Sequence, residues 1–302
     1  MSTHFPPAPS RPAAPYDLHL HTYWSYDAEA APELHFRAAR DRGVKVIAIT
    51  EHHVLDSQAE VREVAVRYPE VRCIAAAELT VTTSIGAVDL LCYGFPATIS
   101  PALQKVLEAY HAWQRNYGAA LSSAVRTMGY PYSDADRLAL LRTYRPEKAI
   151  AVQGNTHVQN SRHDQYFIAR GFVKDAKQVK QFRRRIQEVG NLPAYPSVRE
   201  VVPAVKAAGA LVVIAHPHGY FNFGDEARMD QLRVECQLDG IECAHLAVPM
   251  EFTPVYRAYC VKHGLVSTGG SDSHTQEDID RTFGRHGGDA GWLEEFLGRL
   301  RN

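Results

Sequence analysis

Seven short apolar runs divide the chain, and they predict the strands of one sheet. The runs cover residues 16–21, 44–50, 72–78, 87–94, 210–216, 239–244 and 265–270. Short apolar runs that are flanked by turn residues and alternate with longer helix-periodic segments are typical of buried parallel strands joined by helices. The pattern therefore predicts an α/β fold.

The polar segments between these runs predict the helices. Residues 32–43 begin with Pro32 and end with Gly43, as a helix often does, and further helices are expected at 56–67, 198–208, 250–263 and 288–300. A chain of 302 residues is long enough for one barrel with an insertion or for two smaller domains.

One long segment breaks the alternation of strand and helix. Residues 97–195 hold helical patterns at 102–128 and 175–189 but few strand candidates, so we expect a mostly helical insertion between strands four and five. The barrel domain would then comprise residues 16–96 and 196–302. Residues 1–15 contain five prolines and are expected to form a disordered or extended tail.

Candidate metal ligands stand near the ends of the apolar runs. In Asp17-Leu-His19-Leu-His21 the alternation of a strand places both imidazoles on one face. Five further candidates follow later runs: His52, Glu78, His216, Asp272 and His274. Because the carboxyl ends of parallel strands meet on one side of a barrel, this placement predicts a shared site. Structural residues would be scattered over both ends.

Charge and cysteine content limit the function classes. The net charge of −1 argues against a chain whose whole surface binds nucleic acid. Residues 97–195 carry a net charge of +8, which leaves −9 for the rest, so the insertion is expected to attract an anionic substrate. Alternatively, Lys174, Lys177, Lys180 and residues 183–185 form only a solvated helix face. Five cysteines without C-x-x-C spacing, and no apolar stretch of membrane-spanning length, predict a cytoplasmic protein.

Five ordered motifs resemble those of the PHP family, named for polymerase and histidinol phosphatase. They are Asp17-Leu-His-Leu-His-Thr22 with Ser25 and Asp27, Ile49-Thr-Glu-His52, Ala77-Glu78, Ala215-His-Pro217 and Gly270-Ser-Asp-Ser-His274. Within that family the chain is most similar to small metal-dependent phosphoesterases that carry a helical insertion and act on nucleoside bisphosphates, mononucleotides or short RNA. The resemblance implies a distorted (β/α)7 TIM-like barrel, in agreement with the seven apolar runs.

The resemblance also implies two or three divalent metal ions. His19, His21, Glu78 and Asp272 would hold the first, Glu78 and His216 the second, and Asp27, His52 and His274 the third. Asp89 falls where the family usually has a histidine ligand of the second metal. Imidazole and carboxylate ligands suit Zn, Mn or Fe. A metal-bound hydroxide, positioned by Glu78, Asp272 and His216, is then expected to hydrolyse a phosphate ester.

Substrate contacts are expected from the insertion, where the family has an Arg-Pro-His element. This chain offers His157, Arg162 and His163, and we prefer the last two because their distance to Gly171 fits better. His218 is expected beside the metal ligands, where it would contact the substrate or hydrogen-bond a ligand. His53 is expected to support a ligand, whereas His245 is left open.

Several functions remain possible from the sequence. The expected substrate is a small phosphorylated metabolite, a nucleotide or a short oligonucleotide, and neither a membrane nor duplex nucleic acid is an expected partner. The alternatives are a histidinol-phosphate phosphatase, a metal-dependent amidohydrolase and a non-hydrolytic metal-bearing regulatory module.

Overall fold

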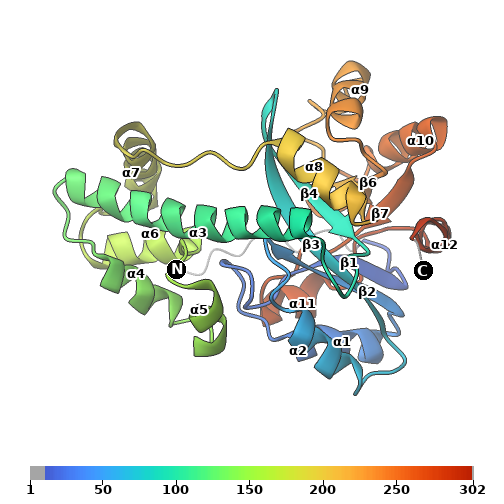
Figure 1. Cartoon of the computed structure of the whole chain (residues 1–302), viewed down its shortest axis with the longest axis horizontal. Coiled ribbons are helices and arrows are strands. Elements are labelled where there is room, and N and C mark those ends of the chain that lie inside the picture. Colours follow the sequence, from blue (N-terminus) through green and yellow to red (C-terminus); the bar gives the residue numbers. More distant parts are fainter. Residues whose placement is uncertain (1–10, 301–302) are drawn as a thin grey trace.

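Seven strands form one curved, nearly closed sheet in the computed structural model, which describes residues 11–300. The strands are β1 (Tyr16–Leu20), β2 (Val46–His52), β3 (Arg72–Thr83), β4 (Gly86–Tyr93), β5 (Leu211–Ile214), β6 (Gly240–Ala244) and β7 (Val266–Gly269). They lie side by side in chain order, and a bridge between Leu20 and Ser273 brings the first and last edges together. The expected α/β class with a distorted (β/α)7 barrel is therefore confirmed (Figure 1).

The direction of β4 differs from the expected parallel arrangement. β4 pairs antiparallel with both β3 and β5, whereas the other pairs are parallel. Only Ser84 and Ile85 connect β3 to β4, and a two-residue connection permits a hairpin but no helical crossover. Because β3 continues to Thr83, Glu78 lies within a strand instead of at its end. The reversal also places Asp89 opposite Thr80, at the same end of the barrel as the other candidates.

Seven helices of the described residues surround the barrel. They are α1 (Pro32–Arg42), α2 (Gln58–Ala65), α8 (Val198–Ala207), α9 (Glu226–Glu235), α10 (Thr253–His263), α11 (Gln276–Thr282) and α12 (Ala290–Arg299). The sequence predicted all of these except α9 and α11. Phe296 of α12 packs edge-on against Tyr93 in the barrel interior, with ring centroids 5.0 Å apart. These two side chains fill the end of the barrel that lies opposite to the carboxyl ends of the parallel strands.

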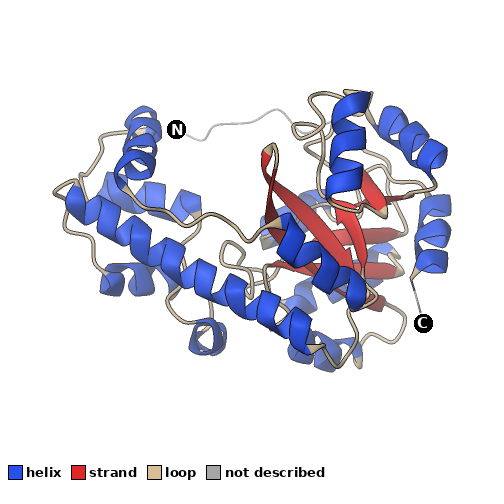
Figure 2. Cartoon of the chain, turned by 45° about the horizontal axis from the view of Figure 1, so that its top comes forward, coloured by secondary structure: helices blue, strands red, loops and turns tan. Residues whose placement is uncertain are grey.

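Five of the six helices between β4 and β5 project from one side of the barrel (Figures 1 and 2). They are α3 (Pro101–Thr127), α4 (Asp134–Leu141), α5 (Glu147–Gln153), α6 (Asn160–Ala169) and α7 (Ala176–Val189). Part of this insertion has its own apolar core, in which α3 contributes Leu121 and Val125, α6 contributes Phe167 and α7 contributes Phe182. We retain residues 97–195 as the proposed bounds of the insertion.

The start of the described chain is extended and packs on the barrel. Ala14 is buried, and its amide donates a hydrogen bond to the carbonyl oxygen of Gly284. Residues 11–15 are therefore bound to the fold, and residues 1–10 of the expected tail lie outside the described residues. Among residues 11–300, no helix has both the length and the apolar character that a membrane crossing requires.

Candidate metal centre

The two histidines of β1 present a nitrogen each to the same point. The Nδ1 atom of His19 lies 3.0 Å from a carboxylate oxygen of Glu242, which can only accept, so Nδ1 carries the proton. The Ser25 hydroxyl donates to Glu51 at 2.6 Å and therefore accepts from Nδ1 of His21 at 3.1 Å. Because both Nδ1 atoms are engaged, the two Nε2 atoms are the nitrogens that can bind a cation, and they lie 3.1 Å apart. A shared cation, or a shared proton in the metal-free protein, can occupy the space between them.

Two carboxylates complete this first cluster, which we define as His19, His21, Glu78 and Asp272. The Oε2 atom of Glu78 lies 3.3 Å from each Nε2, and Oδ1 of Asp272 lies 3.4 Å from His19 and 3.1 Å from His21. A tetrahedral zinc ion with bonds of about 2.0 to 2.1 Å has ligand atoms roughly 3.3 to 3.4 Å apart. The donor atoms of the first cluster are therefore spaced as such an ion requires.

Glu78 connects this cluster to a second one, which comprises Glu78, His216 and Asp89. Its other oxygen, Oε1, lies 3.1 Å from Nε2 of His216, and Asp89 lies 3.8 Å from the same nitrogen. Asp89 accepts hydrogen bonds of 2.6 Å from the hydroxyls of Thr80 and Tyr220, one at each oxygen. His216 has a φ of +50°, a left-handed conformation that is rare outside glycine and typical of functional positions.

A third cluster comprises Asp27, His52 and His274. The Oδ2 atom of Asp27 lies 3.3 Å from Nε2 of His52 and 3.6 Å from Nε2 of His274. Nδ1 of His274 donates to the carbonyl oxygen of Asp272 at 2.8 Å, which leaves Nε2 free to bind a cation. The buried Oδ1 atom of Asp27 has no hydrogen-bond partner, so it also has a free lone pair.

The carboxylates and imidazoles of the three clusters stabilise each other's charged forms. Burial alone would raise the pKa of Asp27, Glu78 and Asp272, but the facing imidazoles hold all three values well below the usual range. Burial also opposes protonation of the imidazoles, yet the carboxylates raise the pKa of His216 to about 9 and that of His274 to about 10. The centre therefore stabilises positive charge, which divalent cations would supply without protons.

All nine expected metal ligands thus come together at one end of the barrel. We propose them as ligands, with groups of three that can hold an ion formed by His19, Glu78 and His216, by His19, His21 and Asp272, and by His21, His52 and His274. A fourth group of this kind joins His19 to Glu242 and His245, which the sequence did not suggest as ligands. His53 lies behind the second cluster, because its Nε2 atom is 2.9 Å from the Thr80 hydroxyl that donates to Asp89.

The structure argues against a substrate role for His163. This side chain is fully buried in the insertion, where Nε2 lies 2.7 Å from the Tyr132 hydroxyl and the ring stacks on Phe167. Arg162, the neighbouring residue, instead points toward the barrel, where its side chain pairs with Glu29 at 2.6 Å. On a helix, consecutive residues face different directions, so only one of the two can point toward the barrel.

His157 lies closer to the metal ligands than the sequence indicated. Its ring centroid is 3.7 Å from that of Tyr26, and Tyr26 is 5.3 Å from His52 of the third cluster. Burial lowers the pKa of His157 to about 3, and its Nδ1 atom has no partner. His157 is therefore a neutral group behind the third cluster.

His218 lies among aromatic side chains. Its Nδ1 atom is 3.0 Å from the Tyr256 hydroxyl, and its ring packs against Phe252 and Phe223. These contacts hold His218, which belongs to the loop that follows β5, and they argue against the expected hydrogen bond to a ligand.

The sequence did not indicate Glu242 of β6, and it left open the role of His245, which follows that strand. Glu242 contacts His19, and Nε2 of His245 lies 3.6 Å from Asp272. Both positions carried a signal. Glu242 places a carboxylate inside the buried run Gly240-Ile-Glu-Cys-Ala244, and His245 directly follows that run, as the other ligands follow theirs.

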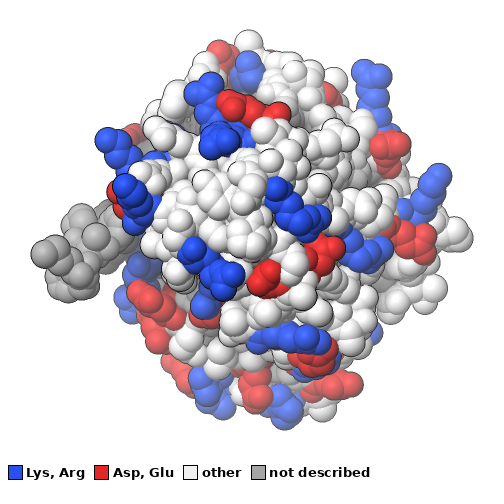
Figure 3. Space-filling view, turned by 90° about the vertical axis from the view of Figure 1, so that its left-hand side faces the viewer, with Lys and Arg blue, Asp and Glu red and all other residues white. Residues whose placement is uncertain are grey.

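Several cations of the insertion contact partners other than the metal centre. Lys148 binds Glu60 of the barrel, Arg183 binds Asp164, and buried Arg145 donates to the carbonyl oxygens of Tyr23 and Trp24. On the outward end of the insertion, Lys and Arg are scattered among other residues and do not form one patch (Figure 3). Of the cations proposed for substrate binding, Arg162 is the one that remains.

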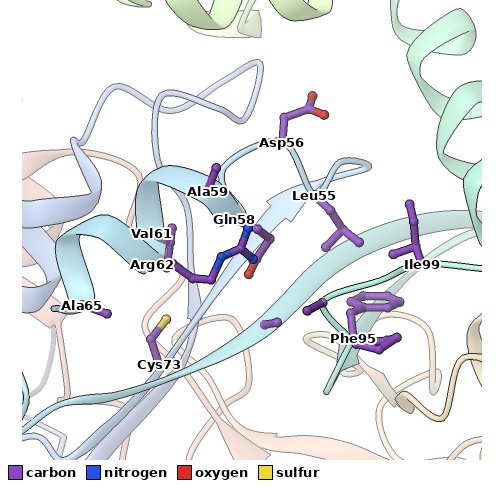
Figure 4. Close-up of a pocket in the computed structure, with 13 residues that line it drawn as sticks. Leu55, Asp56, Gln58, Ala59, Val61, Arg62, Ala65, Cys73, Phe95 and Ile99 are labelled. Atoms are coloured by element: carbon purple, nitrogen blue, oxygen red, sulfur yellow. The ribbon is translucent and has the colours of Figure 1, made fainter.

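A separate cavity of about 450 Å³ lies outside the barrel (Figure 4). It is bounded by α2, the first half of β3 and the segment after β4, with Leu55, Phe95 and Ile99 on one side and Arg62 near its middle. Because no residue of the three clusters lines it, we assign it no part in the centre.

Two relatives of known name align with most of the chain. A 5′-3′ exoribonuclease from Haemophilus influenzae is 22% identical over 263 residues, which are 86% of this chain and 89% of the relative. A 3′,5′-nucleoside bisphosphate phosphatase from Chromobacterium violaceum is 26% identical over 279 residues, 89% of this chain and 90% of the relative.

Two solved structures share the fold. A provisionally assigned metal-dependent phosphoesterase from Bifidobacterium adolescentis has a TM-score of 0.72 at 22% identity and covers 97% of this chain and 98% of its own. An amidohydrolase from Chromobacterium violaceum, with bound sulfate and no metal, also has a TM-score of 0.72 at 22% identity, covering 96% and 98%. These likenesses establish the fold.

The family follows from the sequence profile of the PHP domain. That profile matches residues 17–191, more than half of the 302 residues, and the match begins at the His-x-His strand of the metal centre. The expected resemblance is confirmed, and the chain belongs to the PHP domain family.

Proposed function

We propose that this protein is a metal-dependent phosphoesterase that hydrolyses phosphate esters of nucleotides or short oligonucleotides. Membership of the PHP domain family supports an enzyme that acts on phosphoric ester bonds. The names of two relatives, an exoribonuclease and a nucleoside bisphosphate phosphatase, support the nucleotide class of substrate. The relatives do not distinguish monoester from diester chemistry, so both belong to the proposal.

One observation carries the proposal more than the others. The two oxygens of Glu78 face separate sets of imidazoles, His216 on one side and the histidines of β1 on the other. A shared carboxylate is the usual means of bringing two ions close enough to act on one phosphate. In a purely structural ion-pair network there is no need for both oxygens to face metal-type donors.

The donor set fits two or three divalent ions of the borderline class, Zn, Mn or Fe. Such ions, when bound, lower the pKa of water and neutralise charge on a phosphate group. The chain itself orients the donors: Glu242 fixes His19, and the Ser25 hydroxyl fixes His21. Arg162, at the rim, is placed to bind an anionic group of the substrate, for which it would exchange its contact with Glu29.

A substrate panel with metal analysis tests this function. The purified protein is analysed for bound metals and then assayed with nucleoside 3′,5′-bisphosphates, mononucleotides, 5′-phosphorylated short RNA, a phosphodiester dinucleotide and histidinol phosphate. We expect metal-dependent release of phosphate or nucleotide from at least one nucleotide substrate. Hydrolysis of histidinol phosphate alone would contradict the nucleotide class. A metal-loaded protein inactive on every ester would favour a regulatory module instead.

The cellular compartment is part of the same proposal. All five cysteines are free, and four of them are buried, which suits a reducing environment such as the cytoplasm.

A further inference from the structure

Strand β6 and the residue that follows it supply two polar side chains to the metal centre, although neither is an expected ligand. Glu242 is fully buried and His245 is 4% exposed. A register shift between Glu242 and Ala244 interrupts the pairing of β6 with β7. Ile241, Cys243 and Ala244 pack in the apolar layer that contains α10 residues, so Glu242 and His245 both face the opposite side. An irregularity of this kind redirects a side chain that regular alternation would turn away.

Glu242 determines which nitrogen of His19 is available. Its Oε1 atom accepts a hydrogen bond of 3.0 Å from Nδ1, which fixes the ring and leaves Nε2 as the nitrogen that can coordinate a metal in the first cluster. The other oxygen, Oε2, is buried without a hydrogen-bond partner. A buried carboxylate with an open oxygen is costly unless positive charge lies nearby. A cation held by the first cluster would provide that charge through His19.

His245 has the opposite tautomer. Its Nδ1 atom accepts a hydrogen bond of 3.0 Å from the amide of Ala247, so Nε2 carries the proton and is not a lone-pair donor to a metal. Nε2 is buried without a hydrogen-bond partner and faces Oδ2 of Asp272 at 3.6 Å. Asp272 directs its other oxygen, Oδ1, to the first cluster. His245 is therefore placed to restrain the oxygen that does not face the cluster.

We propose that Glu242 and His245 are positioning residues that hold His19 and Asp272 in the orientation in which the first cluster binds its metal ion. Glu242 keeps Nε2 of His19 free and adds negative charge behind it. His245 limits Asp272 to one oxygen at the cluster. This inference rests on the proposed metal-dependent function, and it assigns to β6 an effect on metal affinity without direct coordination. Partners of this kind typically affect metal affinity by about 10- to 100-fold.

Conservative and disruptive variants separate positioning from packing. Glu242→Gln keeps an oxygen that can accept from Nδ1 of His19 but removes the charge, whereas Glu242→Leu removes both. His245→Gln keeps a donor, whereas His245→Leu does not. Glu235→Gln and His263→Gln, on α9 and α10, are matched controls because both lie outside the centre. Thermal unfolding of each metal-free variant checks that the fold is intact.

The experiment measures metal affinity without any substrate. The full chain is stripped of metal, and the affinity for Zn²⁺ is measured by competition with a chelator, while the visible spectrum of the Co²⁺-loaded protein reports ligand geometry. We expect the affinity for Zn²⁺ to decrease from the wild type to Glu242→Gln and further to Glu242→Leu. The last should lose about 10- to 100-fold and change the Co²⁺ spectrum. His245→Leu should lose affinity that His245→Gln partly restores.

Other results would overturn the inference. Wild-type affinity and spectrum in both leucine variants would make Glu242 and His245 packing residues. Loss of an entire equivalent of metal with Glu242→Gln would instead make Glu242 a ligand. Failure of this inference can be distinguished from failure of the proposed function. Altered affinity with no hydrolysis of any ester refutes only the function, and hydrolysis with unaltered affinity refutes only the positioning role.

Discussion

The carboxylate of Glu78 lies 3.1 Å from Nε2 of His216 through one oxygen, while its other oxygen faces the imidazoles of β1. Glu78 is fully buried, and the histidines that surround it hold its pKa far below the usual range against the opposing effect of burial. A single side chain from the middle of β3 thus connects the first and second clusters.

Glu78→Gln should therefore affect both clusters. An amide presents one oxygen and one nitrogen that cannot coordinate, so one side of the bridge is lost in either orientation. We expect the metal content to fall by at least one equivalent, and ester hydrolysis to fall by more than about 100-fold, since even outer partners cost 10- to 100-fold. Elemental analysis and initial rates measure this. Glu108→Gln, at an exposed site on α3, is the control and should match the wild type.

Asp89 stands where the family resemblance implies a histidine ligand of the second metal, and we propose it as a ligand there. If Asp89 binds the second metal, Asp89→Ala should lower metal content and activity, and Asp89→His should retain much of both. The substitution by alanine also leaves the hydroxyls of Thr80 and Tyr220 without their acceptor. Thr80→Val and Tyr220→Phe separate these effects, because they remove the hydrogen bonds but leave the carboxylate. Unchanged metal occupancy in Asp89→Ala would return Asp89 to a structural role.

Most of the proposed ligands could be brought together from the sequence because they interrupt or follow an apolar run, whereas Asp27 and Asp89 were suggested only by the family resemblance. His216 and His274 could be placed in this way, since a polar residue at the end of a buried strand has few structural explanations. The direction of β4 could not be predicted, because alternation along a strand is the same in both directions. Glu242 was missed because its role depends on His19, a contact 223 residues away in sequence. The burial of His163 likewise depends on how α6 packs on its neighbours.

In the metal-free protein, the free energy of unfolding should decrease as the pH becomes alkaline. Burial opposes protonation of His52 and His216, but nearby carboxylates raise the pKa of each to about 9 in the metal-free protein. Because these values exceed the ordinary value of about 6.5, the folded state binds more protons than the unfolded state. This stabilisation is complete below pH 6.5 and is lost as the pH rises through about 9.

Thermal unfolding of the chelator-treated protein between pH 7 and pH 9.5 measures this loss. We expect the melting temperature to fall across that range, and stoichiometric Zn²⁺ to reduce the fall, because the ion replaces the protons in the clusters. An equal fall with and without Zn²⁺ would show that other groups cause it.

Arg162 provides the last test, which concerns the choice of substrate. Metal ions held by the three clusters would act on the scissile phosphate alone, so preference for one ester over another is expected to arise from contacts with the rest of the substrate. Arg162 lies at the junction of insertion and barrel, where it contacts Glu29 and packs over the ring of Tyr144. Its ion pair is partly exposed, so exchange for a substrate phosphate is inexpensive.

Arg162→Ala should lower kcat/KM for a nucleoside bisphosphate roughly tenfold or more, because a charge-assisted contact is lost. This corresponds to about 1.5 to 3 kcal/mol less stabilisation of the transition state. Hydrolysis of p-nitrophenyl phosphate, which has no second phosphate, should change much less. His163→Ala is the matched variant. It removes a buried ring from the core of the insertion, so it should lower the free energy of unfolding by about 2 to 4 kcal/mol. Its effect on the two substrates should be equal. Selectivity that changed with His163→Ala but not with Arg162→Ala would reverse this assignment.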